Sequence, residues 1–258
     1  MKTSILGLVA VGAVIASPAM AADLPVKAPP YVPPPAPVLN WTGCYIHGGV
    51  GYGMFNEEHS LIDTTTVPVT LITAASTTGG EGWLGRLGAG CDYQIASSWV
   101  IGAFGDYDFA DLEGTFQDAG LGGGKEKDQA TWHVGGRIGY LVTPSVLAFV
   151  SGGYTQTRFG QIDISVFTVP PTPIGFNIPE DTFHGWFIGG GTEYALSGLI
   201  PINGLFWRTE YRYDRYQKSD LQVVETATGL PAAAAVRTQT NVQTVTTSLV
   251  WRFNFGGL

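Results

Sequence analysis

Charged residues are scarce in this sequence, and basic residues are the scarcest of them. Asp, Glu, Lys and Arg make up 13% of the 258 residues, about half the usual share. The 13 Lys and Arg residues face 21 Asp and Glu residues, which gives a formal net charge of −8. An acidic chain without basic clusters is a poor partner for a phosphate backbone, so the composition argues against nucleic-acid binding.

Long hydrophobic runs are missing after the first 21 residues. Residues 1–21 carry Lys2, an apolar run and the small-residue pattern from Ala19 to Ala21, which together predict a cleaved secretory signal peptide. Beyond it, no apolar stretch approaches the ~20 residues of a membrane-spanning helix. Hydrophobic residues nevertheless make up 45% of the chain. An exported chain of this kind is either a soluble secreted β-protein or a membrane barrel whose apolar residues are dispersed over alternating strands.

Proline, in contrast, is locally abundant, and a regular alternation follows it. Prolines concentrate in residues 22–40, which we expect to form an extended leader in the periplasm. In residues 41–258, segments whose polarity alternates with period two predict β-strands. We predict eight strands, at residues 43–54, 81–94, 98–109, 129–142, 145–159, 182–196, 205–216 and 240–255.

The predicted strands are joined alternately by long loops and by turns. The long loops are residues 55–80, 110–128, 160–181 and 217–239, and the turns are residues 95–97, 143–144 and 197–204. This order is typical of an outer-membrane barrel, whose loops lie outside the cell and whose turns lie in the periplasm.

The alternation separates aromatic from charged side chains. In residues 205–216, the even positions from Arg208 to Asp214 are all charged, and the odd positions include Trp207 and Tyr213. Aromatic residues crowd the predicted strand ends: Trp41, Trp83, Tyr93, Trp99, Trp132, Tyr140, Tyr213, Phe253 and Phe255. Tryptophan and tyrosine favour the two membrane interfaces, and the lumen of an eight-stranded barrel is too narrow for so many rings. We therefore expect the aromatic face to contact lipid.

The opposite face should then line the lumen with charges. Its predicted members are Arg86, Asp92, Asp106, Asp108, Arg137, Glu193, Arg208, Glu210, Arg212, Asp214 and Arg252. The near balance of sign indicates a network of paired charges, for which bidentate arginine–carboxylate geometry is well suited. Such a network can plug the barrel, which is our main interpretation, or line an ion-conducting pore.

Cysteine and histidine are few and scattered. Cys44 and Cys91 lie near the periplasmic ends of the first two predicted strands and point to the same side, so in an oxidising compartment we expect a disulfide; two separate thiols are the alternative. No histidine has zinc-site spacing, so no metal or other cofactor is expected. His59 and His184 lie in or beside predicted loops and are the candidate contacts for hemin iron. Neighbouring side chains such as His59 and Ser60 point apart on a strand and lack a third catalytic partner, so we expect no enzyme activity.

Short motifs along the mature chain add a family resemblance. "AADLP" before the proline-rich leader, then "WTGCYI", "GCDYQ", "IGAFGDYDF", "GGRIGY", "SGGY", "GGGTEYAL" and "EYRYD" together resemble the small outer-membrane barrel proteins of alphaproteobacteria, the immunogenic, opacity-like members of the porin superfamily. His47 stands where the opening strand of this family more often has glycine. Many members end on the aromatic residue that the assembly machinery recognises, whereas three residues follow Phe255 here. The residues expected to form the insertion signal are Leu249, Trp251, Phe253 and Phe255.

The resemblance implies an all-β fold, an eight-stranded antiparallel up-and-down transmembrane β-barrel exported to the cell outer membrane of a Gram-negative bacterium. We expect a non-enzymatic protein with a structural or surface-interaction role, in which residues 55–79 and 161–181 contact hosts or ligands. Expected partners are outer-membrane lipid, lipopolysaccharide and the outer-membrane assembly machinery. Some relatives are porins and others bind hemin, so a narrow porin for small solutes or a hemin-binding receptor is the alternative.

Overall fold

The computed structural model describes residues 39–166, 168, 171–200 and 202–253, all within the unit Val38–Leu258. The predicted signal peptide, most of the proline-rich leader and Phe255 lie outside these residues. Antiparallel strands make up most of the described chain. Among the described residues, no helix is long and apolar enough to cross a membrane.

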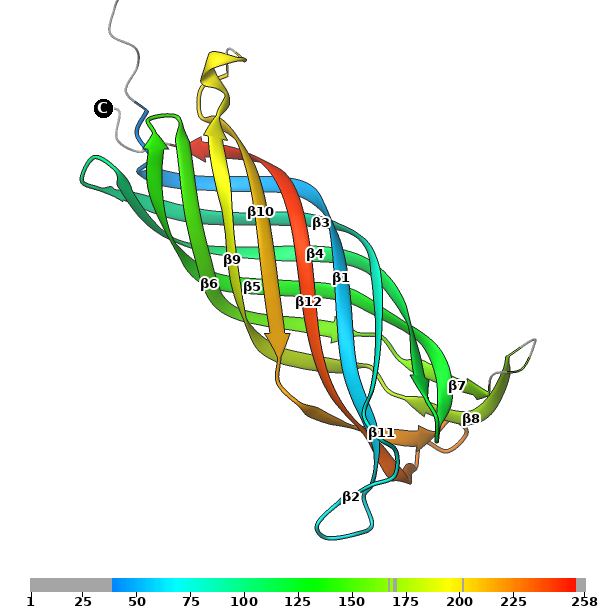
Figure 1. The fold of residues 1–258 in the computed structure, drawn as a ribbon. Coiled ribbons are helices and arrows are strands. Elements are labelled where there is room, and N and C mark those ends of the chain that lie inside the picture. The colour runs from blue at the N-terminus through cyan, green and yellow to red at the C-terminus, as the bar shows by residue number, and fades with distance from the viewer. Residues whose placement is uncertain (1–38, 167, 169–170, 201, 254–258) are drawn as a thin grey trace, which may run out of the picture. The chain divides into compact units, whose positions relative to one another are not determined.

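Eight of the described strands pair into a closed ring (Figure 1). In ring order they are β1 (Gly43–Asp63), β3 (Ser76–Ile95), β4 (Trp99–Asp118), β5 (Gly122–Thr143), β6 (Val146–Phe159), β9 (Asp181–Ala195), β10 (Leu205–Tyr216) and β12 (Pro231–Phe253). Strand β12 pairs back with β1 from Cys44↔Phe253 to Asp63↔Ala234, which closes the ring. Each ring strand contains most or all of one strand predicted from the sequence.

The two ends of the ring differ. At the turn end, short connections join β3 to β4, β5 to β6, and β9 to β10, the last through the 3-10 helix η1 (Leu196–Gly198). The described residues also begin and end there (Figure 1). The opposite end, called the loop end here, carries four further strands: β2 (Thr70–Leu71), β7 (Ile162–Val166), β8 (Thr172–Ile178) and β11 (Ser219–Glu225).

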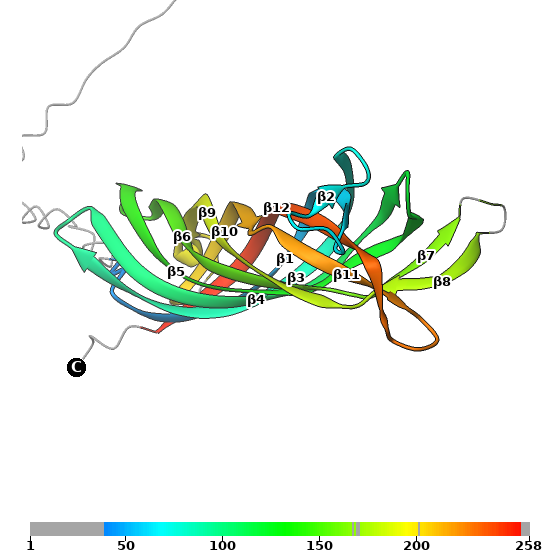
Figure 2. The same cartoon turned by 90° about the horizontal axis from the view of Figure 1, so that it is seen from below.

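Most of the chain expected to form long loops is strand instead. Where β6, β9 and β10 end, β7, β8 and β11 take their places between β5 and β12 (Figure 2). The pairings β5–β7, β7–β8, β8–β11 and β11–β12 close a second ring at the loop end. We call the part of the barrel wall on the loop-end side of Tyr52 and Trp132 the loop-end extension.

The prediction of loops failed here because inward and outward residues no longer differ in hydrophobicity toward the loop end of the strands. In residues 55–63, the inward side chains Phe55, Glu57 and His59 mix apolar with ionisable groups, and the outward Asn56 and Glu58 are polar. The chain still alternates in and out, but no longer between apolar and polar residues, so the period-two signal disappears. Of the contact loop expected at residues 55–79, residues 55–63 and 76–79 are therefore barrel wall, and the exposed connection is limited to residues 64–75.

Two apolar clusters fill the interior, one near each end. The turn-end cluster contains Trp41, Tyr45, Val100, Phe104, Leu141, Leu147, Phe187, Ala195, Phe206 and Val250. The loop-end cluster contains Phe55, Leu61, Leu84, Leu112, Phe116, Phe159, Ile162, Ile164, Ile178, Phe183, Tyr216, Leu221, Val223, Val236 and Val242. The lumen thus holds more large rings than expected, although most of the aromatic residues expected to contact lipid do face outward, among them Trp83, Tyr93 and Trp99.

Glycines on neighbouring strands make room for these rings. A Cβ added at Gly90 would lie 2.5 Å from the Tyr45 hydroxyl, and one added at Gly135 would lie 2.7 Å from the Phe187 ring. Trp41, expected at the membrane interface, is instead fully buried, and its Nε1 donates a hydrogen bond to the Pro144 carbonyl at 3.2 Å.

Candidate functional site

Strand β10 carries a charged layer between the two apolar clusters. Its inward side chains are, in order, Phe206, Arg208, Glu210, Arg212, Asp214 and Tyr216. Phe206 belongs to the turn-end cluster and Tyr216 to the loop-end cluster. Because period two points all six side chains to one side, the four charges between the rings are as buried as the rings themselves.

Glu193 and Asp92 organise the part of this layer nearer the turn end. Glu193 accepts hydrogen bonds from Arg137 at 3.0 Å, Arg208 at 2.8 Å and Arg252 at 2.6 Å. Asp92 accepts a bidentate pair from Arg137, at 3.0 and 2.5 Å, and one bond from Arg252 at 2.6 Å. Three guanidinium groups thus share two carboxylates, which leaves one positive charge in excess.

The ring of Tyr45 covers these guanidinium groups. Its centroid lies 4.8 Å from the Cζ atoms of Arg137 and Arg208 and 5.1 Å from that of Arg252. Cation–π attraction of this kind favours the charged guanidinium and so helps to hold the excess positive charge. Tyr45 faces inward because it alternates with the outward Cys44 and Ile46 on β1.

A second group of ions lies nearer the loop end. Arg86 pairs with Asp108 through two hydrogen bonds of 2.6 Å and lies 3.6 Å from Glu210. Arg212 donates to Asp106 at 2.8 and 3.2 Å and to Glu210 at 3.0 Å. This geometry is the bidentate arrangement for which arginine is suited.

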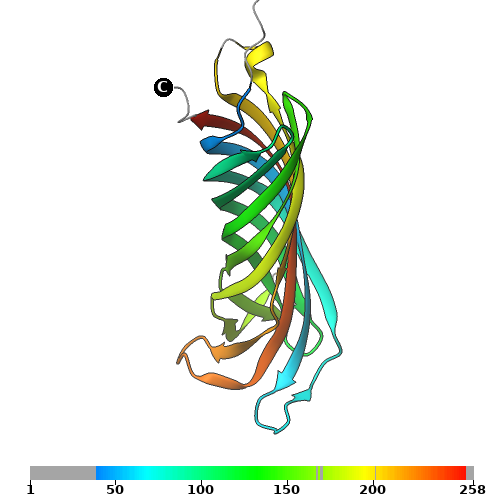
Figure 3. The ribbon, with the colours of Figure 1, turned by 90° about the vertical axis from the view of Figure 1, so that its left-hand side faces the viewer.

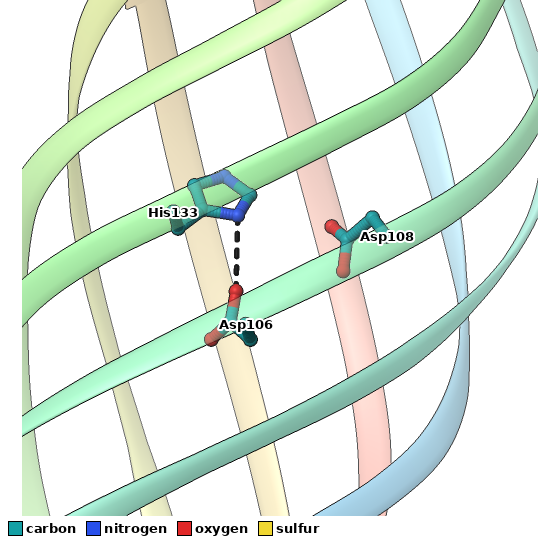
Figure 4. A group of neighbouring side chains, drawn as sticks. All are labelled: Asp106, Asp108 and His133. Carbon is teal, nitrogen blue, oxygen red and sulfur yellow. Dashed lines mark ion pairs between the residues drawn. The ribbon is translucent and has the colours of Figure 1, made fainter.

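His133 completes the second group by bridging two carboxylates. Its Nδ1 lies 3.0 Å from Asp106 Oδ1, the contact dashed in Figure 4, and its Nε2 lies 2.8 Å from Asp214 Oδ1. An ionised carboxylate only accepts hydrogen bonds, and a neutral imidazole would aim a lone pair at one of the two oxygens. The Nδ1 contact with Asp106 lacks hydrogen-bond geometry, but two carboxylates this close to the ring favour the imidazolium form. The pairing of His133 with Asp214, 81 residues away in the chain, could not be read from the local pattern of β5.

With His133 charged, the ions of these two groups balance; Asp128, also buried next to the second group, instead accepts a hydrogen bond of 2.8 Å from Thr157. The six bases are Arg86, His133, Arg137, Arg208, Arg212 and Arg252, and the six acids are Asp92, Asp106, Asp108, Glu193, Glu210 and Asp214. The structure thus buries all eleven residues expected in the lumen and adds a twelfth. A neutral set of paired, hydrogen-bonded ions avoids the large cost of burying an unpaired charge.

The same region contains the residue types of a metal site. Ligand atoms of Asp106, Asp108 and His133 lie within 4.8 Å of one another (Figure 4). Arg212 and Arg86, however, already occupy the two carboxylates. A divalent cation placed among them would face two guanidinium groups, so these residues fit an ion-pair cluster and we assign them no metal.

Outside the ring, exposed apolar side chains form a belt between two aromatic girdles. The loop-side girdle contains the contacting ring pairs Tyr52–Trp83, Tyr107–Phe109, Trp132–Tyr154 and Trp186–Tyr213. The turn-side girdle contains the pairs Trp99–Tyr140 and Trp251–Phe253. Between them, Val50, Ile101, Ile138 and Ile188 face outward. This surface is that of a barrel in lipid, with aromatic residues at both interfaces.

The two cysteines and the described residues of the predicted insertion signal lie on the outward face. Cys44 and Cys91 are directly paired across β1 and β3 and form a disulfide. Leu249, Trp251 and Phe253 face outward on β12, near its pairing with the first residues of β1.

The two candidate hemin ligands lie on opposite sides of the barrel wall. His59 is buried inside the extension, where its Nε2 lies 2.8 Å from the Gln117 carbonyl oxygen. His184 faces outward and forms a hydrogen bond with the Tyr154 hydroxyl. The expectation that His59 is an exposed hemin contact is therefore wrong, because the segment that carries it is an inner wall and not a loop.

The extension also buries a pair of carboxyl groups. Glu57 on β1 and Glu126 on β5 are both buried, and Thr240 donates a hydrogen bond of 3.1 Å to Glu57. Burial and the nearby Glu57 carboxylate raise the pKa of Glu126 well above its ordinary value. The extension thus favours the protonated form of this side chain.

Comparisons with known proteins identify a family and several similar proteins. The model of the outer membrane protein β-barrel domain family matches residues 7–253. The 31 kDa outer-membrane immunogenic proteins of Brucella melitensis and Brucella suis are each 30% identical to this chain over 262 residues, covering 98% of it and 100% of theirs. Among solved structures, the outer membrane protein OprG of Pseudomonas aeruginosa is 14% identical, covers 83% of this chain and 98% of its own, and gives a TM-score of 0.48.

The family match spans nearly the whole chain, and the Brucella relatives confirm the resemblance to small outer-membrane barrel proteins of alphaproteobacteria. The protein is accordingly located in the cell outer membrane, with its apolar belt in lipid. The chain belongs to the outer membrane protein β-barrel domain family.

Proposed function

We propose that the protein is a sealed, non-enzymatic barrel that crosses the outer membrane with eight strands and presents its loop-end extension outside the cell. The eight strands are those of the first ring, because both aromatic girdles are built from their outward residues. Beyond the loop-side girdle, outward positions become charged, as at Glu58, Asp111 and Lys127. This change of polarity marks the upper limit of the lipid contact.

The observation that carries the proposal is the filled lumen. Twelve paired ions occupy the middle of the barrel, and apolar clusters occupy it on either side. Conduction of ions or small solutes needs a continuous water-filled path through the lumen. These side chains fill the space that such a path would occupy. The narrow porin is therefore the less favoured alternative.

Structural and surface roles follow from a sealed barrel. The belt and girdles would bind outer-membrane lipid and lipopolysaccharide, and the outward residues Leu249, Trp251 and Phe253 would be read by the assembly machinery. The extension, which has its own apolar core, would hold the connections at its far end in fixed positions for contacts with hosts or ligands.

Planar-bilayer conductance tests the proposal. Refolded protein, with folding and insertion checked by heat-modifiable migration on gels, is expected to insert without adding current. Reproducible current steps from the folded wild type would contradict the sealed barrel. In intact cells, a thiol introduced by Val67→Cys should react with a membrane-impermeant reagent, whereas one introduced by Ser97→Cys in the β3–β4 turn should not. The reverse pattern would refute the proposed orientation.

A further inference from the structure

The connection between β1 and β3 exposes apolar side chains outside the lipid belt. We name residues 64–75, which include β2, the β1–β3 tip. Within it, Val67 is 99% exposed, Leu71 67% and Ile72 53%. Most other large apolar residues of the extension are buried in the loop-end cluster. An apolar group exposed against this trend marks an interaction surface.

The partner that fits the tip is a second lipid bilayer facing the cell, and we infer that the tip docks on it. Residues 64–80 contain no charged side chain. The largest group of exposed apolar residues, in the belt, contacts lipid, and the tip likewise exposes apolar side chains without charge. This inference rests on the proposed function, because it requires the loop end to lie outside the cell.

The polar groups at the base of the tip already have partners, so contact with lipid does not leave them unsatisfied. Thr73 donates a hydrogen bond to Asp118 at 2.8 Å and accepts one from the Leu61 N–H at 2.9 Å. The Asp63 carboxylate accepts two from Thr65, at 2.8 and 2.6 Å, and the Ile72 N–H donates to the Leu61 carbonyl at 2.8 Å. Internal satisfaction of polar groups is the condition for placing chain in an apolar medium. These bonds also hold the tip in one shape before it binds.

Other connections at the loop end have the same character. Residues 164–179 and 226–236 are also free of charge, and they expose Ile174 and Leu230. The β1–β3 tip and the β11–β12 hairpin leave the barrel on different sides (Figure 3; compare Figure 2). Separate apolar tips around a rim match an extended, deformable surface better than a single groove in a protein. Because the chain has a net charge of −8, the bilayer that fits carries no net negative charge.

Flotation of nanodisc-embedded protein with phosphatidylcholine vesicles tests the inference. We expect wild-type nanodiscs to float with the vesicles, while empty nanodiscs do not, and high salt should leave the bound fraction unchanged because the contact is apolar. The triple variant Val67→Ser/Leu71→Ser/Ile72→Ser should bind at least about tenfold more weakly, because three apolar side chains are removed from the contact. The matched control Leu199→Ser/Ile202→Ser, which removes exposed apolar residues at the turn end, should bind like wild type.

A fluorescent label locates the contact. Both cysteines of the chain are in the disulfide, so Val67→Cys and Leu199→Cys each provide a single free thiol for an environment-sensitive dye. Added vesicles that carry nitroxide-labelled acyl chains should quench the dye at position 67 and leave the dye at position 199 unchanged.

Three outcomes would overturn the inference: wild-type nanodiscs that fail to bind, binding that high salt abolishes, or equal binding of the triple variant. A tip that recognises only a protein would give the first of these. Because conductance and cell-surface labelling test the sealed barrel and its orientation separately, either proposal can fail while the other stands.

Discussion

Replacement of Glu193 by glutamine is the sharpest perturbation of the lumen, because this one carboxylate contacts three arginines. The substitution keeps the shape of the side chain and removes its charge. Arg137 and Arg252 keep Asp92 as a partner, but Arg208 loses its paired carboxylate. Leaving one member of a buried ion pair uncompensated costs about 3–5 kcal/mol. We expect Glu193→Gln to lower the free energy of unfolding by that amount.

The assay is equilibrium unfolding by urea in phospholipid vesicles, followed by tryptophan fluorescence. The matched control is Asp220→Asn, which breaks the Asp220–Arg237 pair on the outer surface of the extension at 2.7 Å. Exposed pairs of this kind are screened by water and salt, so the control should behave almost like wild type. The double variant Glu193→Gln/Arg208→Gln should regain part of the loss, with an interaction energy of about 0.5–3 kcal/mol. If Glu193→Gln were no more destabilising than Asp220→Asn, the lumen ions would be solvated and the reasoning refuted.

Three further perturbations test other parts of the barrel by the same unfolding assay. Gly88→Ala would place a Cβ 2.4 Å from His47 Nε2 and 2.6 Å from Asp106 Cβ, and should lower the free energy of unfolding by about 1–3 kcal/mol. A Cβ at Gly85 meets open space, so Gly85→Ala should be neutral. Equal effects of the two substitutions would contradict the packing. Replacing Cys44 and Cys91 together by serine opens a cross-link that spans 47 residues and should cost about 4 kcal/mol, matched by reduction of the wild type; an unchanged midpoint would contradict the disulfide. The folded state raises the pKa of Glu126, so the protonated side chain stabilises the fold. This stabilisation is complete below the pKa that Glu126 has in the unfolded chain, and it is lost as the pH rises through the pKa that Glu126 has in the folded protein. Proteolysis of the extension should therefore increase with pH in wild type and much less in Glu126→Gln, and identical pH profiles would count against this.

The membrane-crossing part of the fold was predictable because its two faces differ so strongly. Lipid outside and ions inside make apolar and charged residues alternate, so strands such as β10 could be assigned a face residue by residue. The structure has Ile101 outward and Asp106 inward, as the alternation predicts. Where the wall leaves lipid, the outward residues become polar and this contrast ends. The loop-end extension was missed for that reason.

The sequence predicts which charged residues line the lumen, but not which of them form ion pairs. Inward charges could be read from the sequence, but which acid meets which base depends on register between strands that are far apart in the chain. Arg212 pairs with Asp106, 106 residues away, and Arg252 with Asp92, 160 residues away. Burial of Trp41 was also beyond reach, because it depends on the fit of the ring against Phe206 at the closed turn end.

The neutral lumen explains how so many charges can lie inside a barrel surrounded by lipid. Each of the twelve ions finds a partner within the ring, so the wall around them can face hydrocarbon without an unpaired charge behind it. His133 is the sixth base, which makes the number of bases in this set equal to the number of acids.

Thiol accessibility along β12 tests the sealed lumen most directly. Thr244, Thr246 and Ser248 are small, inward and buried, and each can be replaced by cysteine in a chain whose own two cysteines are bonded. In membranes, a small water-soluble methanethiosulfonate should leave all three thiols unmodified while it modifies Leu230→Cys at the exposed loop end. Rapid modification at any of the three inward positions in the folded protein would show a water-filled lumen and contradict the account.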